Sequence, residues 1–198
     1  MNEPDVREEL RIIRAMVEKT RRSTAETGGL FVFWGGLIIA ALGGTMILEH
    51  FKQYRWIWLF WTAVVVLGWG YSLFYGLKRS RAKTAKTYAE MATRHLGIAC
   101  GSGFLLACFA LPLLKIYPTD VIPVVFSLIA GIFFFVFGGI QEWPLFLWIG
   151  AAWWAGSIGL AMVPPQIRNP AFLGLFVAGY FVPSLLVWLK YRREQRVR

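Results

Sequence analysis

The segment that decides the fold is GGLFVFWGGLIIAALGG, residues 28–44, an apolar run that three pairs of glycines interrupt. On a helical wheel the glycines gather within about half of the circumference; they are Gly28, Gly29, Gly35, Gly36, Gly43 and Gly44. Small residues let helix backbones approach each other in lipid, where packing contacts replace the missing hydrophobic drive. We therefore expect a helix-packing face, covered by another helix of the chain, by a second copy or by a ligand.

Five further apolar runs follow the first, and none of the six contains Asp, Glu, Lys, Arg or His. A helix needs about 20 apolar residues to cross a bilayer. The predicted spans are Gly28–Leu48, Trp56–Leu77, Leu96–Leu114, Val121–Ile140, Pro144–Val163 and Ala171–Leu189. Only 16% of the residues are charged, against about a quarter in soluble domains. The sequence therefore predicts an all-α membrane protein with a six-helix transmembrane bundle over residues 28–190.

The basic residues predict the orientation of the bundle. Of the 21 Lys and Arg residues, 17 lie before the first span, between the second and third, or after the last. The remaining four, Lys52, Arg55, Lys115 and Arg168, lie on the opposite side. Loops rich in Lys and Arg stay in the cytoplasm. Both termini should therefore be cytoplasmic, including a basic tail over residues 191–198, and anionic lipids are candidate partners of this basic side.

Residues 1–27 are predicted to contain a cytoplasmic amphipathic helix. Val6, Leu10, Ile13 and Val17 recur with spacings of four, three and four residues, which places them on one helical face. Pro4 suits the start of a helix, and the acidic residues that follow it suit the positive end of its dipole. This face is a candidate docking surface for a partner protein. Lying on the membrane and packing on a cytoplasmic loop of the same chain are the alternatives.

The third and sixth spans resemble each other. Residues 103–112 (GFLLACFALP) and 174–183 (GLFVAGYFVP) share glycine, alanine and proline in register. Three spans repeated end to end have opposite topologies, which is typical of transporters, so a 3+3 inverted repeat is one prediction. Pro112 and Pro183 should each deprive a carbonyl of its donor, at Cys108 and Gly179. Such carbonyls can coordinate a solute or be satisfied by a neighbouring side chain.

Several function classes have no support in the sequence. No intramembrane acid or base is present to relay protons, and no catalytic set, cofactor motif or metal motif can be assembled. His50 and His95 lie at opposite membrane faces, and Cys100 and Cys108 share one apolar run. We therefore expect no enzyme activity, no cofactor, no metal and no nucleic acid partner, with the lipid bilayer as the main environment.

The second half resembles a family of bacterial six-span membrane proteins that has no settled activity. The resemblance rests on Lys86-Thr-Tyr88, Tyr117-Pro118 and Gly179-Tyr-Phe-Val-Pro183, the last followed by Leu189-Lys190-Tyr191, and it covers about residues 78–195. It implies placement in the bacterial inner membrane.

Two functional hypotheses remain open. In the first, the bundle binds or conducts a small neutral or lipophilic solute, with a candidate site formed by Cys108, Pro112, Trp153, Trp154, Gly179 and Pro183. In the second, the protein is a membrane-anchored regulatory or assembly subunit that docks a partner through its N-terminal helix. Binding of anionic lipids is compatible with both, and a homo-oligomer or a protein partner bound through the N-terminal helix is a further candidate.

Overall fold

The computed structural model describes the backbone of residues 29–82 and 88–196. The predicted docking face on Val6, Leu10, Ile13 and Val17 lies outside the described residues, as does Gly28. Within the described part the chain is helical, and six helices are long and apolar enough to cross a membrane. The prediction of six helices long and apolar enough to span a membrane is confirmed.

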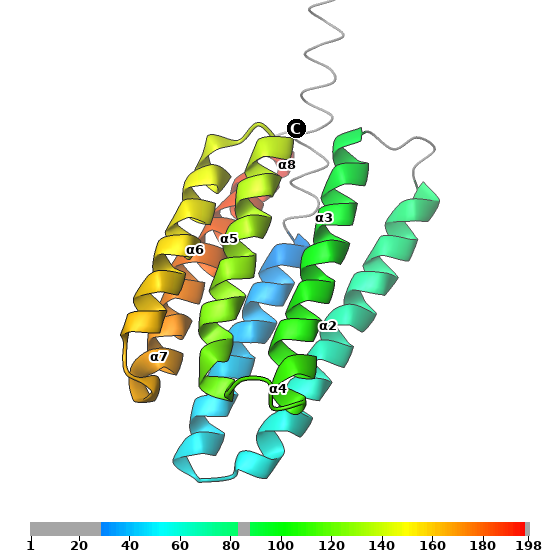
Figure 1. Ribbon diagram of the computed structural model, residues 1–198. Coiled ribbons are helices and arrows are strands. Elements are labelled where there is room, and N and C mark those ends of the chain that lie inside the picture. The colour runs from blue at the N-terminus through cyan, green and yellow to red at the C-terminus, as the bar shows by residue number, and fades with distance from the viewer. Residues whose placement is uncertain (1–28, 83–87, 197–198) are drawn as a thin grey trace, which may run out of the picture.

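The helices follow one another along the chain with short connections (Figure 1). The first helix is Gly29–His50. It is followed by α2 (Tyr54–Ala82), α3 (Tyr88–Leu105), the π-helical turn η1 (Leu106–Ala110), α4 (Leu111–Leu113), the 3₁₀ turn η2 (Thr119–Val121), α5 (Ile122–Ile140), α6 (Pro144–Met162), α7 (Pro165–Phe176), the π-helical turn η3 (Val177–Phe181) and α8 (Val182–Arg196).

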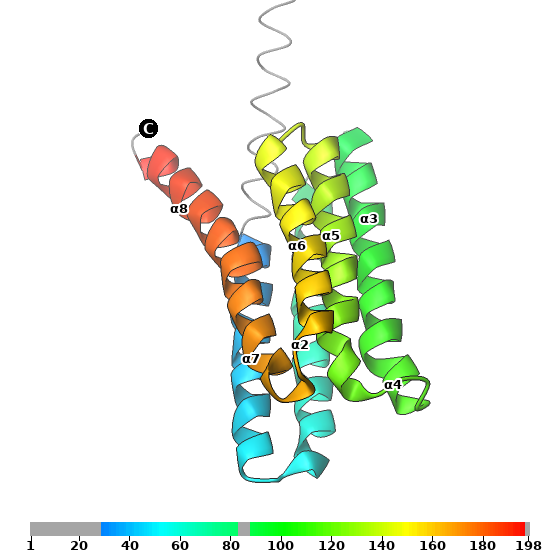
Figure 2. The same ribbon diagram turned by 60° about the vertical axis from the view of Figure 1, so that its left-hand side comes forward.

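The helices lie side by side, with α5 between α6 and α3 in both views (Figures 1 and 2). The third span (α3, η1 and α4) runs down Figure 1, and the sixth (α7, η3 and α8) runs up it. Figure 2 shows that α7 stays beside α6 whereas α8 leans away from it. The sixth span therefore changes its relation to the bundle near η3.

Two helices begin earlier than the apolar runs predict. The third begins at Tyr88 rather than Leu96, and the last begins at Pro165 rather than Ala171. Helical hydrogen bonding does not require apolar side chains, so a helix can begin before its apolar run. Proline, as at Pro165, is well suited to the first turn. One consequence is that Arg168, predicted to lie in a loop, is a buried residue of α7.

Three connections use a residue with positive φ that is not glycine. Lys52, Lys115 and Glu142 have φ values of 55°, 59° and 51°. Each follows a spanning helix, and the next backbone N–H bonds a carbonyl five residues earlier, as in Gln53 to Leu48 at 2.8 Å. These hydrogen bonds are those of a Schellman ending, which usually takes glycine at this position. The sequence therefore lacks the usual signal for these three helix ends.

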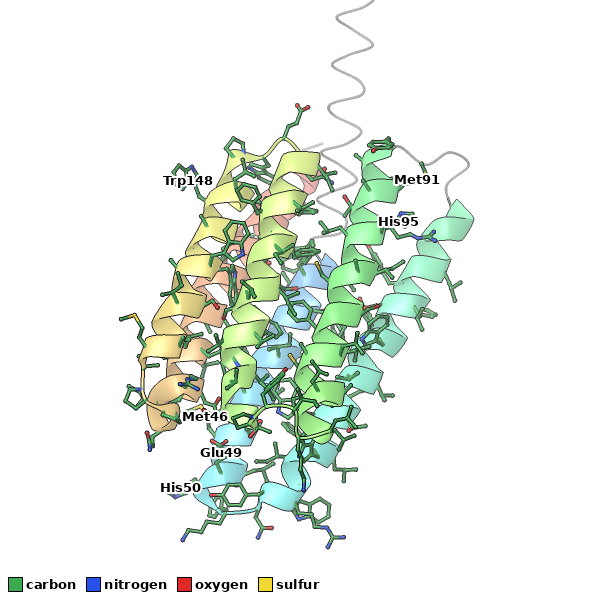
Figure 3. All side chains as sticks on the ribbon, viewed as in Figure 1. Met46, Glu49, His50, Met91, His95 and Trp148 are labelled. Carbon is green, nitrogen blue, oxygen red and sulfur yellow. The ribbon has the colours of Figure 1, made fainter. Side chains whose placement is uncertain are left out.

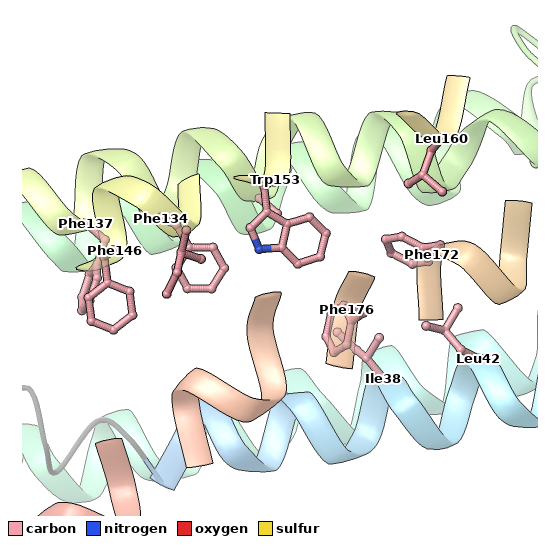
Figure 4. Packing of buried hydrophobic residues seen from close by; sticks show 11 residues of the cluster. Ile38, Leu42, Phe134, Phe137, Phe146, Trp153, Leu160, Phe172 and Phe176 are labelled. Atoms are coloured by element: carbon pink, nitrogen blue, oxygen red, sulfur yellow. The ribbon is translucent and has the colours of Figure 1, made fainter. Parts of the chain in front are cut away.

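The core is a cluster of aromatic and aliphatic side chains that joins the first helix, α5, α6 and α7. Trp153 is fully buried at its centre, with Phe134, Phe137 and Phe146 on one side and Phe172 and Leu160 on the other (Figure 4). Ring pairs here are edge-to-face or stacked, for example Phe137–Phe146 with centroids 5.1 Å apart. Such pairs contribute specific contacts in addition to burial.

The closest helix approach lies between α5 and α6. A Cβ added at Gly150 would lie 2.7 Å from the backbone nitrogen of Phe135, and one added at Gly138 would lie 2.8 Å from that of Leu147. Neither gap has room for a side chain, so glycine is needed at both positions for the backbones to meet.

Candidate functional site

On the glycine face of the first helix, some glycines lie against other parts of the chain and others have no neighbour within 4 Å. A Cβ added at Gly35 would lie 2.8 Å from Phe181 Cδ2, and one at Gly44 would lie 2.5 Å from Phe60 Cε1. Gly29 lies against Trp188 of α8, at 3.6 Å from such a Cβ to Nε1. Cβ atoms at Gly36 and Gly43 would meet nothing within 4 Å. Among the described glycines of this face, packing within the chain requires glycine only at Gly35 and Gly44, since a Cβ at Gly29 would make an ordinary contact.

The predicted proline effect takes the form of a π-helical turn in both spans. Leu111 N–H bonds the carbonyl of Leu106, and Val182 N–H bonds that of Val177, five residues back in each case. The next residue is Pro112 or Pro183, which has no N–H. The carbonyls in these turns therefore lose donors from their own helix and need others.

In the sixth span the donor comes from α6. The indole Nε1 of Trp153 donates to the carbonyl oxygen of Gly179 at 3.1 Å. Gly179 also leaves room for the ring, because a Cβ there would lie 3.1 Å from the same Nε1. The structure therefore brings Trp153 and Gly179 together, with Pro183 four residues further along the same helix.

In the third span the donor is Tyr117, whose hydroxyl donates to the carbonyl of Ala107 rather than that of Cys108. Tyr117 lies in the connection between α4 and η2. Burial raises the pKa of its phenol above the ordinary value, and nearby Cys108 adds to the effect. The hydroxyl therefore keeps its proton at neutral pH and can donate it to the carbonyl.

The six residues predicted to form a solute site do not converge on one place. Cys108 and Pro112 belong to the third span, which α5 separates from α6 (Figures 1 and 2). Trp154 lies against α5, where its Nε1 donates to the carbonyl of Leu128 at 3.3 Å. Its ring lies over Gly131 so closely that a side chain at Gly131 would have no room. Of the six, only Trp153 and Gly179 are shown in contact, with Pro183 four residues further along the same span.

The hydroxyl groups along the helices are largely engaged within the chain. Those of Thr45, Thr62, Ser72, Ser127, Ser157 and Ser184 each donate to a backbone carbonyl. Two of them also accept an indole N–H: Trp34 donates to Ser72 Oγ and Trp61 to Thr45 Oγ1, both at 2.9 Å. Among the described residues, no fully buried side-chain nitrogen or oxygen lacks a partner.

Sequence reasoning missed a polar cluster around Arg168. The guanidinium donates to the carbonyls of Leu160 and Val163 at 2.9 and 3.1 Å, at the end of α6. It also donates to the carbonyl and carboxylate oxygens of Asp120, in η2, at 3.0 and 2.7 Å. The next residue, Asn169, donates to Glu49 Oε1 of the first helix at 3.2 Å. A lone basic residue near a span end gives no signal of such partners.

The two histidines lie at opposite ends of the bundle, His50 near Glu49 and His95 near Met91 (Figure 3). Both are exposed, and His95 Nδ1 lies 2.8 Å from the carbonyl oxygen of Met91. Among the residues that the structure describes, no group of three His, Cys, Asp or Glu side chains is placed to hold a metal ion.

Comparison with family models, with curated proteins and with solved structures finds no match for this chain. The resemblance of residues 78–195 to a bacterial six-span family therefore stays a prediction.

Proposed function

We propose that this protein is a membrane-anchored regulatory or assembly subunit that docks a partner protein through its N-terminal segment. The supporting observation is how the bundle uses its interior. Rings fill the space around Trp153, and the hydroxyl and indole groups beside them are bonded within the chain. Such an interior favours a scaffold, whereas a solute pathway needs polar groups that are available to the solute.

The proposed topology places the bundle in the bacterial inner membrane with both termini in the cytoplasm. Its support is the excess of Lys and Arg in three segments. Gly29, the first residue of the described first helix, lies against Trp188 of α8. Anionic lipids on this side would contribute about 1 kcal/mol for each basic residue near the surface.

The proposed 3+3 inverted repeat gains support from the two π-helical turns. Each turn begins six residues before a proline and ends two residues before it. The turns are Leu106–Ala110 before Pro112 and Val177–Phe181 before Pro183. Single π-helical turns are rare in α-helices. Their equal register in the third and sixth spans, which run in opposite directions, is what an inverted pair predicts.

The docking proposal is tested by placing one charge on either side of the predicted N-terminal helix. Leu10→Glu puts a carboxylate in the apolar stripe, and Ala15→Glu puts one on the opposite face. Native mass spectrometry of the protein gently extracted from its own membrane is the measurement. We expect a second protein in fixed ratio with the wild type and with Ala15→Glu, and at least tenfold less of it with Leu10→Glu. The chain alone in all spectra, or full recovery with Leu10→Glu, would contradict docking.

The solute hypothesis keeps one specific observation in its favour, the Trp153–Gly179 contact at a π-helical turn. π-helical turns are frequent at functional sites. The same spectra report on it, because a bound small molecule adds a discrete mass. Retention of such a mass by the wild type, and its loss with Trp153→Leu but not with Trp154→Leu, would favour solute binding over docking.

A further inference from the structure

The sixth span is held very differently on the two sides of η3. On the α7 side, Arg168 makes hydrogen bonds to both α6 and η2, and Asn169 bonds Glu49. Phe172 and Phe176 are 3% and 0% exposed in the core. This half is therefore tied to the first helix, to η2 and to α6 at the same time.

On the α8 side, the helix is less deeply buried than α7. Among residues 182–189, whose side chains the structure describes, Ser184 alone is buried, and its hydroxyl bonds Tyr180 within the same span. Val187 is half-buried and packs against the core. Val182 and Leu186 are 42% and 61% exposed. Trp188 meets the first helix at Gly29. Figure 2 shows the result, with α8 leaning away from α6.

Between these halves lies η3, where helical hydrogen bonding is weakened. A π-helical turn before a proline lacks part of the regular backbone ladder, and such places are where helices bend. The hydrogen bond from Trp153 Nε1 to the Gly179 carbonyl connects η3 to α6. The third span has a π-helical turn too, but only the three residues of α4 follow it before the chain leaves the helix. The third span therefore has no long helix after its π-helical turn that could swing.

We propose that η3 is a hinge, that α8 swings about it relative to α6 and α7, and that the Trp153–Gly179 hydrogen bond is the latch that holds α8 in the orientation seen in this structure. The swing needs neither the docked partner nor a solute. It moves the C-terminal end of α8, and with it Trp188, past the start of the first helix at Gly29. A hinge absorbs such a motion in a few residues while the helices on both sides stay rigid.

The test removes the latch donor and keeps the ring. Trp153→Phe deletes the indole N–H that bonds Gly179, whereas Trp154→Phe deletes the neighbouring indole N–H, which bonds Leu128 in regular α-helix. Hydrogen–deuterium exchange of the full chain in lipid nanodiscs is followed for peptides covering residues 177–186. We expect at least tenfold faster exchange there with Trp153→Phe, no change in residues 165–174, and wild-type exchange throughout with Trp154→Phe.

Distances between spin labels report the swing itself. One pair joins α6 to α8 (Trp148→Cys with Leu186→Cys) and the other joins α6 to α7 (Trp148→Cys with Ile167→Cys), at sites that are 75%, 61% and 51% exposed. Both pairs are made with Cys100→Ala and Cys108→Ala, while the exchange experiment keeps the native cysteines. With Trp153→Phe, the α6–α8 distribution should broaden or shift to longer distance and the α6–α7 distribution should not change.

Three outcomes would overturn the hinge. Wild-type exchange and distances with Trp153→Phe would mean that the indole bond holds nothing in place. Equal changes in both label pairs, or the same changes with Trp154→Phe, would mean that the bundle loosens as a whole instead of bending at η3.

Discussion

Arg168 joins the ends of two other helices through a single side chain. Its planar guanidinium offers several donors in fixed directions, and here they meet two carbonyls at the end of α6 and two oxygens of Asp120. Exposed carbonyls at a helix C-terminus carry partial negative charge, so a cation beside them is stabilised. The side chain is 11% exposed and that of Asp120 is 36% exposed, so water screens the pair only partly.

At this scale we predict that Arg168→Met destabilises the protein by about 2 kcal/mol, because it leaves buried carbonyls without donors. Arg168→Lys should lose less, since it keeps the charge without the fork. The control is Arg55→Met, at an exposed position near the start of α2, with an expected change within about 0.5 kcal/mol. Unfolding in mixed detergent micelles measures all three. Equal stability of Arg168→Met and Arg55→Met would show that the cluster does not stabilise the fold.

Among the elements, α5 and α6 form the tightest pair. Gly150 of α6 lies over the backbone of α5 at Phe135 and Gly131, and Gly138 of α5 lies over α6 at Phe146 and Leu147. Because backbone atoms cannot move aside as a side chain can, a methyl group at these positions must push the helices apart. Helix association in lipid depends on this close fit.

We therefore predict that Gly150→Ala costs about 1–3 kcal/mol of stability through overpacking. Gly159→Ala lies on the same helix with nothing within 4 Å, and it should be neutral or stabilise by up to about 1 kcal/mol, because alanine favours helix over glycine. Thermal unfolding of both variants in detergent makes the comparison. A loss with Gly159→Ala as large as that with Gly150→Ala would indicate a general effect of alanine in α6, and not the contact with α5.

For the molecule as a whole, the first helix has an inner and an outer side. Gly35 is buried against η3, whereas Gly36 is exposed and would place a side chain where no other part of the described chain lies. The two neighbours therefore separate packing within the chain from contacts made outside it.

We predict that Gly35→Leu lowers the unfolding temperature, because its side chain must displace Tyr180 and Phe181, and that Gly36→Leu leaves it unchanged. Mass measurement in detergent adds the oligomeric state. Gly36→Leu could also lower the unfolding temperature when the wild type is a dimer in detergent. That result would mean that a second copy covers this side of the helix. A loss in a monomeric sample would contradict the assignment of Gly36 to the outside.

The sequence alone determined that the chain is helical and has six apolar spans, because a membrane helix must satisfy its backbone within itself and needs a fixed apolar length. Both requirements are local. Proline at Pro112 and Pro183 also marked, from sequence, where two helices lose regular bonding. Tertiary structure alone decided which glycines are covered, which carbonyl Trp153 reaches and that Arg168 is buried. Several of those contacts join residues far apart in the chain, such as Trp153 with Gly179 (26 positions) and Arg168 with Asp120 (48 positions). Nothing in the spacing of apolar residues encodes which helices become neighbours.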